Sequence, residues 1–181
     1  MHALKIEGGH VNLVHRDVSP HNLLLSSSGS LKLIDFGIAK AATNRNLTNP
    51  GTTKGKAGYF SPEQAMGKLL DGRSDLFSLA GSLYQLLCGK LPFEGDSMAQ
   101  LMFKIASEPP TDILSVRPDV PAGLVAFLDK AFAKEADDRF QTGEEFAAAL
   151  RAAFAGGGAP AAQPAAAPAA PAAGGGVDIE L

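Results

Sequence analysis

Hydrophobic and polar positions follow two different patterns along the chain, and the change falls near Ser61. Before it, "LVHRD" and "HNLLL" are short apolar runs bounded by polar turns, "SSSGS" reads as a turn, and "LKLID" alternates as a strand does. After it, apolar residues recur at helical spacing. The pattern therefore predicts a small β-hairpin region in the first third of the chain and a helical body behind it.

Four helices are predicted after Ser61, each from an apolar stripe with a signal at one end. Gly89 follows the first stripe as a C-cap, and Asp96 or Ser97 precedes the second as an N-cap. Thr142, followed three residues later by Glu145, predicts a capping box at the start of the last helix. The predicted helical segments are residues 73–89, 96–108, 122–134 and 142–154.

The composition changes after Phe154, where the chain becomes almost entirely Ala, Pro and Gly. Proline blocks helix formation and glycine adds chain entropy, so such a segment cannot bury enough apolar surface to fold. We therefore expect residues 155–181 to be a disordered tail and residues 1–154 to be one folded domain.

Composition and charge narrow the class of protein. The chain is 45% hydrophobic and 19% charged, with a formal net charge of −3 and no basic stripe, so a nucleic acid is not an expected partner. A single cysteine, Cys88, excludes an internal disulfide and fits a reducing compartment, where we expect it to pack in a helix. No apolar run approaches the ~20 residues of a membrane span, so we expect a cytoplasmic location.

Three oxygen-bearing side chains, Asp17, Asn22 and Asp35, stand around the predicted hairpin. The "SSSGS" turn would fold Asp35 back beside Asn22, and Gly37 lets the backbone turn sharply just after it. Magnesium prefers oxygen ligands and keeps some of its waters, so an amide and a carboxylate could hold it against phosphate oxygens. An aspartate outside the metal site could orient or deprotonate a hydroxyl. Taken singly, Asp17 fits a turn former and Asp35 a strand-end cap.

Five segments in order resemble eukaryotic-type protein kinases. "HRDVSPHN" resembles the catalytic loop and "DFG" at 35–37 the metal-binding turn, while "SPEQ" resembles the end of the activation segment. "SDLFSLAGSLYQLLCGKLPFEGDS" is similar to the central helix and the loop after it, and "DDRFQTGEEFAAAL" to the last conserved arginine and final helix. The residues in these segments are most similar to those of bacterial serine/threonine kinases. The resemblance implies an α+β, mainly α-helical C-terminal lobe, a transferase activity, a protein substrate, and ATP and Mg²⁺ as cofactors.

The resemblance also implies catalytic roles. Asp17 would accept the proton of the substrate hydroxyl, and Asn22 and Asp35 would hold Mg²⁺ against the nucleotide phosphates. Leu24 would lie under the adenine ring. Arg16 would be the basic partner of a phosphorylated activation segment.

Further residues have implied structural roles. His15 and Phe36 would stack in an internal apolar column. Asp75 would accept hydrogen bonds from the catalytic-loop backbone. Glu63 and Arg139 would form a buried ion pair that ties the activation segment to the helical body. The alternative is that these two charges lie on the surface with little energetic weight.

Ser19 and Lys56 depart from the family pattern. Most serine/threonine kinases place a lysine where this chain has Ser19, and a threonine where "GKAGYFSPEQ" has Lys56. Removing a cation from a phosphate-transfer site is costly. We therefore hypothesise an exchange, in which Lys56 supplies the charge and Ser19 the hydrogen bond. The alternative is a solvated Lys56 in a degraded site.

The second departure concerns the smaller lobe of the family, because nothing before Leu13 matches its glycine-rich loop, strand lysine or helix glutamate. Residues 1–10 could supply at most a turn or two of the helix that precedes the catalytic loop. One face of the ATP adenine would then be in contact with the chain, but nothing would cover the other face. We therefore expect negligible kinase activity from this chain alone. Three hypotheses follow: a fragment of a serine/threonine kinase whose N-lobe segment is missing, a non-catalytic pseudokinase module that binds substrates or another kinase, and a metal site for phosphate-ester hydrolysis.

Overall fold

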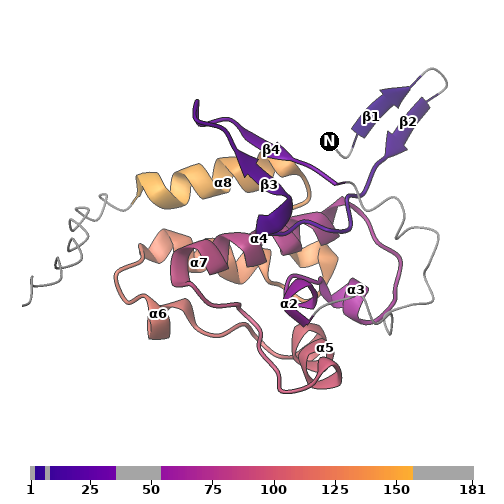
Figure 1. Ribbon diagram of the computed structural model, residues 1–181. Coiled ribbons are helices and arrows are strands. Elements are labelled where there is room, and N and C mark those ends of the chain that lie inside the picture. Colours follow the sequence, from indigo (N-terminus) through magenta and orange to yellow (C-terminus); the bar gives the residue numbers. More distant parts are fainter. Residues whose placement is uncertain (1–2, 7–8, 36–53, 157–181) are drawn as a thin grey trace, which may run out of the picture.

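The computed structural model describes residues 3–6, 9–35 and 54–156, which form two β-hairpins and a helical body (Figure 1). The β3–β4 hairpin lies over the helical body, whereas the β1–β2 hairpin stands away from it. The strands are β1 (Ala3–Ile6), β2 (Gly9–Asn12), β3 (Leu23–Leu25) and β4 (Leu31–Leu33). The helices are α2 (Lys54–Ala57), α3 (Pro62–Ala65), α4 (Gly72–Cys88), α5 (Met98–Ser107), α6 (Ile113–Val116), α7 (Ala122–Ala131) and α8 (Gly143–Ala155), with 3₁₀ turns η1 (Pro20–Asn22) and η2 (Ala136–Asp138).

The predicted hairpin at the polar cluster is confirmed. Strands β3 and β4 pair antiparallel, with Leu23 opposite Leu33 and the serine-rich turn between them. Gly29 takes a φ of 80° in that turn, a conformation that glycine adopts without steric cost. Beyond the strands, the Ile34 amide donates to the Asn22 carbonyl over 2.9 Å, so the pairing continues to the residue before Asp35.

The first residues of the chain form strands and not the expected helical turns. Strands β1 and β2 pair antiparallel from Ala3 opposite Asn12 to Ile6 opposite Gly9. The expectation of a helical turn or two over residues 1–10 is therefore wrong. Leu4 and Ile6 alternate with their neighbours at a period of two, which favours a strand, and the glycines that follow favour a hairpin turn.

Helix α4 runs through the middle of the molecule and begins and ends on clear caps. The Asp71 carboxylate accepts a hydrogen bond from the Arg73 amide at its start. Gly89, the predicted C-cap, ends the helix with a left-handed φ of 69°. Inside the helix, the buried hydroxyls of Ser78 and Ser82 donate to carbonyls four residues earlier, so small polar side chains are buried without loss of hydrogen bonding.

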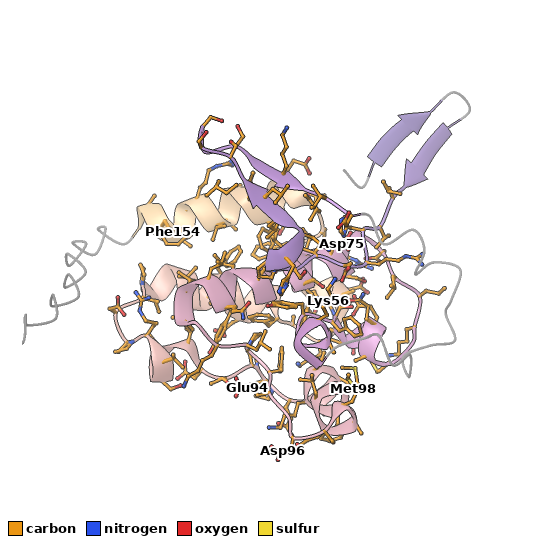
Figure 2. All side chains as sticks on the ribbon, in the orientation of Figure 1. Lys56, Asp75, Glu94, Asp96, Met98 and Phe154 are labelled. Atoms are coloured by element: carbon orange, nitrogen blue, oxygen red, sulfur yellow. The ribbon has the colours of Figure 1, made fainter. Side chains whose placement is uncertain are left out.

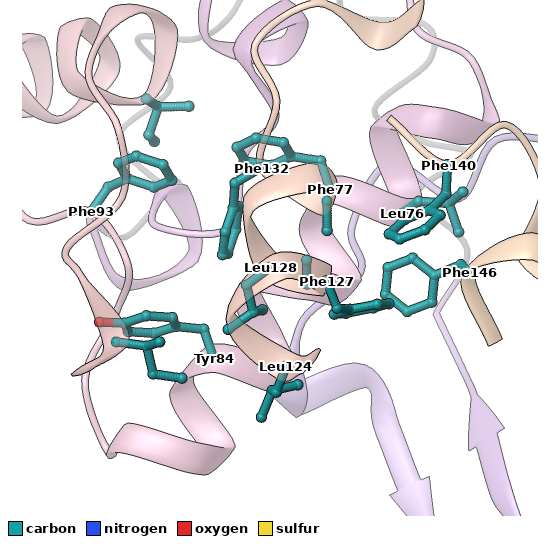
Figure 3. Packing of buried hydrophobic residues seen from close by; sticks show 14 of the residues in the cluster. Leu76, Phe77, Tyr84, Phe93, Leu124, Phe127, Leu128, Phe132, Phe140 and Phe146 are labelled. Atoms are coloured by element: carbon teal, nitrogen blue, oxygen red, sulfur yellow. The ribbon is translucent and has the colours of Figure 1, made fainter. Parts of the chain in front are cut away.

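Aromatic side chains from α4, α7 and α8 and the loops around them fill the core in two groups (Figure 3). Phe132 packs edge-on against Phe77 of α4, with ring centroids 5.3 Å apart, and against Phe93 at 5.8 Å. On the other side of α7, Phe127 packs against Phe140 at 5.1 Å and Phe146 at 4.8 Å. Offset and edge-on aromatic contacts of this kind contribute beyond the area they bury. Helix α7 is therefore the element that joins α4 to α8.

The predicted capping box of α8 is right in one half only. The Thr142 hydroxyl accepts from the Glu145 amide over 3.1 Å, as expected. The Glu145 carboxylate, however, accepts from the Gln141 amide and from Lys130. The side chain thus reaches one residue further back than a capping box requires, because Lys130 on α7 holds its other oxygen.

The loop between α4 and α5 packs tightly on the start of α5. Ser97, one of the two expected caps, accepts from the Gln100 amide. A Cβ atom added to Gly95 would lie 2.7 Å from the amide nitrogen of Leu101 and 3.0 Å from its Cα. Glycine therefore lets this loop approach the helix backbone more closely than any side chain would allow.

Helices α2, α3 and α6 were not predicted, since a four-residue helix is too short to carry a hydrophobic period. Cys88 is half-buried at the end of α4, and the expected tail beyond residue 156 lies outside the described residues. None of the helices within the described ranges is long and apolar enough to cross a membrane.

Candidate functional site

A loop between β2 and β3 carries Asp17 and Asn22, and Asp75 holds its backbone. The amides of His15 and Arg16 donate to the two oxygens of the Asp75 carboxylate, over 2.7 and 2.9 Å. Asp75 lies in the first turn of α4 and is only 4% exposed. Arg16 has a left-handed φ of 67°, a costly conformation for a long side chain that persists where its surroundings enforce it. The central helix thus fixes the loop at its most strained residue.

His15 connects this loop to the end of the β3–β4 hairpin. Its imidazole is fully buried, and its Nε2 lies 2.9 Å from the Ile34 carbonyl. A carbonyl only accepts, so Nε2 carries the proton. Its Nδ1 is then the acceptor for the Asp17 amide, at 3.3 Å. Both bonds together require the neutral imidazole. Through these two bonds, His15 positions the Asp17 backbone relative to the hairpin.

Asn22 lies beside Asp17 at the start of the hairpin and is nearly buried. Its Nδ2 donates to the Asp17 carbonyl over 2.7 Å, so the amide oxygen is the atom left to serve as a cation ligand. Asp35 follows Ile34, whose amide bonds to the Asn22 backbone, and has an exposed side chain and a φ of 57°. An amide oxygen and a carboxylate at one end of a hairpin are the oxygen donors that Mg²⁺ accepts.

No three His, Cys, Asp or Glu side chains gather into a metal-binding group within the described ranges. The expected magnesium ligands, Asn22 and Asp35, include only one carboxylate and are not a cluster of that kind. The donor set therefore fits a cation that takes its remaining ligands from phosphate and water.

The ammonium of Lys56 lies next to the carboxylate of Asp17. The Lys56 Nζ atom is 3.3 Å from Asp17 Oδ2, and the two side chains are 38% and 11% exposed. Lys56 lies where α2 meets the loop held by Asp75 (Figure 2). The structure therefore brings the cation of Lys56, on α2, to the carboxylate of Asp17, in the loop between β2 and β3.

Ser19 lies in the same loop, but its environment differs from the expectation. It is 1% exposed, and its hydroxyl oxygen has no hydrogen-bond partner among the residues that the structure describes. The hydrogen bond that the hypothesised exchange gave to Ser19 is therefore not formed within that part of the chain. Ser19 is the N-cap residue of η1, and its side chain makes no cap hydrogen bond there.

Glu63 and Arg139 form a two-pronged ion pair. The Arg139 nitrogens Nη1 and Nη2 lie 2.8 Å from the two Glu63 oxygens, and the side chains are 1% and 12% exposed for arginine and glutamate respectively. Arg139 also donates to the carbonyls of Ala133 and Lys134, and Ser74 donates to Glu63. The pair thus lies in the interior with its hydrogen-bonding groups occupied.

The pKa of Glu63 reflects two opposed effects. Burial raises the pKa of the carboxyl, but hydrogen bonds from Arg139 and Ser74 and the charge of Arg139 together bring it below its ordinary value. Glu63 is therefore held as a carboxylate, which links α3 to the segment before α8.

Gln64 is a residue of this region that sequence reasoning missed. Its Oε1 accepts from the Ser61 amide, and the Ser61 hydroxyl accepts from the Gln64 amide, which makes a capping box on α3. Its Nε2 donates to the Arg16 carbonyl over 3.0 Å. The Ser61–Gln64 spacing could have predicted the cap. No local pattern could have predicted a contact with a residue 48 positions away.

The remaining predicted site residues lie apart or outside the described part of the chain. Leu24 is on β3 and 52% exposed, so it offers an apolar surface on the hairpin. Phe36 and Gly37 lie outside the described residues.

Comparison with known proteins finds protein kinases, both by family and by individual relatives. The protein kinase domain family matches residues 8–150. The tyrosine-protein kinase MasK of Myxococcus xanthus is 45% identical over 146 residues, which cover 79% of this chain and 22% of that protein. The probable serine/threonine-protein kinase PknB of Lactococcus lactis is 41% identical over 74% of this chain and 21% of its own length. The serine/threonine-protein kinase PrkC of Bacillus subtilis is 36% identical, with shares of 78% and 22%. The chain thus spans about a fifth of the length of these relatives.

Proposed function

Because this chain belongs to the eukaryotic-type protein kinase family found in bacteria, we propose that it forms the C-terminal lobe of a serine/threonine kinase. The reaction is the transfer of the γ-phosphate of ATP to a protein hydroxyl. Relatives named as serine/threonine kinases support Ser or Thr as the acceptor, while the name of MasK makes tyrosine the acceptor to be tested against.

The single observation that carries the proposal is the arrangement around Asp17. Its carbonyl accepts from Asn22, its amide donates to His15, and its carboxylate lies 3.3 Å from Lys56. The backbone of Asp17 is thereby held on both sides, in a loop whose preceding amides bind Asp75. Positioning and charge stabilisation account for most of the catalysis of phosphoryl transfer, so a carboxylate on a held backbone beside a cation suits this chemistry.

In the proposed mechanism Asp17 accepts the proton of the substrate hydroxyl. A bond forms between that oxygen and the γ-phosphorus, and the bond from the γ-phosphorus to the bridging oxygen breaks, so that ADP leaves with the electron pair. Lys56 lies beside the carboxylate and neutralises charge on the phosphoryl group that passes it. Lys56 thus replaces the cation that Ser19 does not provide.

Asn22 and Asp35 would hold Mg²⁺, which supplies charge neutralisation at the β- and γ-phosphates when bound. Leu24 would lie under the adenine, and a lobe that carries a glycine-rich loop and a strand lysine would cover it. Arg16 would bind a phosphorylated threonine of the activation segment.

The test combines binding and transfer. If the proposal holds, Mg²⁺ with ATP raises the melting temperature of the chain more than ATP alone, and Asp35→Asn removes the magnesium-dependent part. In a polypeptide that also carries a kinase N-terminal lobe, Asp17→Asn lowers transfer to Ser/Thr peptides by roughly 10²–10⁴-fold. Asp119→Asn, in a surface ion pair with Arg117, is the matched control.

Three results would contradict the proposal. Undiminished phosphate transfer in the Asp17→Asn variant would mean that Asp17 is not the base. Transfer to tyrosine peptides alone would overturn the acceptor. Release of phosphate from simple esters without nucleotide would favour a hydrolase instead.

A further inference from the structure

Gln64 makes a contact that its helix cap does not require. Its Oε1 closes the capping box with Ser61, while its Nε2 donates over 3.0 Å to the carbonyl of Arg16 in the catalytic loop. We propose that Gln64 is a positioning residue that fixes the peptide unit between Arg16 and Asp17. The inference rests on the proposed role of Asp17 as the base.

The peptide unit between Arg16 and Asp17 is held from both sides. Its carbonyl accepts from Gln64, and its amide donates to His15 Nδ1 at 3.3 Å. A peptide unit is planar, so two contacts at its opposite ends fix its orientation. That orientation sets the direction in which the Asp17 Cα presents its side chain.

Arg16 needs this support because its backbone is strained. Its φ of 67° places a long side chain in the left-handed region, a costly conformation that persists only where the surroundings enforce it. Asp75 holds the amide of Arg16 at 2.9 Å, and Gln64 holds its carbonyl. Without Gln64, the strained residue would be held on one side only.

Glutamine suits both tasks because its amide has an acceptor and two donors. A glutamate at this position would keep the acceptor for Ser61, but would have no donor for Arg16. Gln100 offers an internal comparison, since it holds the same place in the first turn of α5. The backbone amide of Gln100 donates to Ser97 Oγ, and its side-chain Oε1 accepts from the backbone amide of Asp96. Both bonds lie at the start of its own helix.

The consequence is a direct link from α3 to the proposed base. Helix α3 closes the activation segment, and Glu63 at its second position is paired with Arg139. A displacement of α3 would therefore withdraw the donor from the Arg16 carbonyl and release Asp17 from its orientation.

The test compares Gln64→Glu and Gln64→Met with Gln100→Glu and Gln100→Met in the full chain. Gln64→Glu keeps the cap acceptor and removes the donor, whereas Gln64→Met removes both without adding charge. Hydrogen exchange is measured at the amides of Arg16 and Asp17, with the melting temperature as the measure of global stability. We expect exchange at these two amides to become about fivefold faster in both Gln64 variants and to stay unchanged in both Gln100 variants.

Turnover provides the second measurement, in a polypeptide that also carries the N-terminal lobe. Both Gln64 variants should lower kcat while the KM for ATP stays within about twofold, because a misoriented base affects the chemical step. Unchanged exchange at both amides, or an equal rise throughout the chain, would overturn the inference. If the unsubstituted protein transfers no phosphate, the proposed function fails, and the exchange data alone decide whether Gln64 orders the loop.

Discussion

The residues around Asp17 include a cation that comes from a distant part of the chain. Lys56 comes from α2, 39 residues away, and its Nζ lies 3.3 Å from the Asp17 carboxylate. A lysine has a long, flexible stem and carries a compact point charge, so its position depends less on its backbone than that of most side chains. The pair is partly exposed, so its own contribution to stability is small. In the proposed reaction, it places positive charge where phosphate charge would develop.

The charge of Lys56 can be tested with neutral and cationic replacements. Lys56→Met removes the cation and keeps the stem length, so transfer should fall by about 10²–10³-fold. Lys56→Arg keeps the charge and should retain a larger part of the activity. Both are measured as kcat for a Ser/Thr peptide, in a polypeptide that also carries the N-terminal lobe. Lys68→Met is the control on the surface, and equal turnover in Lys56→Met and Lys68→Met would contradict the role of Lys56.

The sequence was most informative at positions where one residue type has one physical meaning. The hairpin around the serine-rich turn and the C-cap at Gly89 followed from local pattern, because turns and caps depend on a few adjacent residues. The hairpin of β1 and β2 was missed because the resemblance led us to expect a helix there. The buried Ser19 hydroxyl and the Gln64 contact also escaped prediction, since both depend on residues that are distant in the chain.

Among the secondary-structure elements, α4 depends on how its end is made. Gly89 stops the helix with a φ of 69°, and its amide donates to the Gln85 carbonyl. A Cβ atom at this position would contact nothing within 4 Å. Steric conflict with neighbours is thus absent there, and only the backbone conformation favours glycine.

Gly89→Ala should therefore lower the free energy of unfolding by about 1–2 kcal/mol, the cost of the left-handed conformation. Gly143→Ala is the control, because Gly143 begins α8 in open space and has no left-handed φ. There alanine should instead leave stability unchanged or raise it by up to about 1 kcal/mol. Urea denaturation measures both. A loss of the same size in the two variants would mean that the cap conformation is not what matters.

At the scale of the whole molecule, the Glu63–Arg139 pair joins segments that lie 76 residues apart. It connects α3, and through Gln64 the loop that carries Arg16 and Asp17, to the segment that leads into α8. A buried pair of this kind is weak evidence for added stability, but losing one partner is costly because a buried charge is left behind. The pair therefore acts as a point at which the two halves of the helical body depend on each other.

Glu63→Gln should lower the free energy of unfolding by about 3–5 kcal/mol at pH 7, because it leaves Arg139 buried without its carboxylate. The folded-state pKa of Glu63 lies below its ordinary value of 4.5, so its contribution is present above that pH and is lost as the pH falls through the lower folded-state value. The native chain should consequently lose stability more steeply on acidification than the variant. Denaturant unfolding between pH 3 and 7, spanning roughly the carboxyl range, measures this.

Glu145→Gln is the matched control, because Glu145 pairs with Lys130 on the surface. Its effect should stay below about 1 kcal/mol. If both variants behaved alike at every pH, the interior pair would have no special weight.

The closeness of Gly95 to the first turn of α5 has a consequence for how freely this chain can vary. Any other amino acid would place an atom 2.7 Å from the backbone nitrogen of Leu101, and a main chain cannot swing aside as a side chain can. Gly55 borders open space, so neighbouring atoms leave room for a larger residue there. In a saturation library, position 95 should tolerate only glycine. Natural variants of this chain should keep glycine there for the same steric reason.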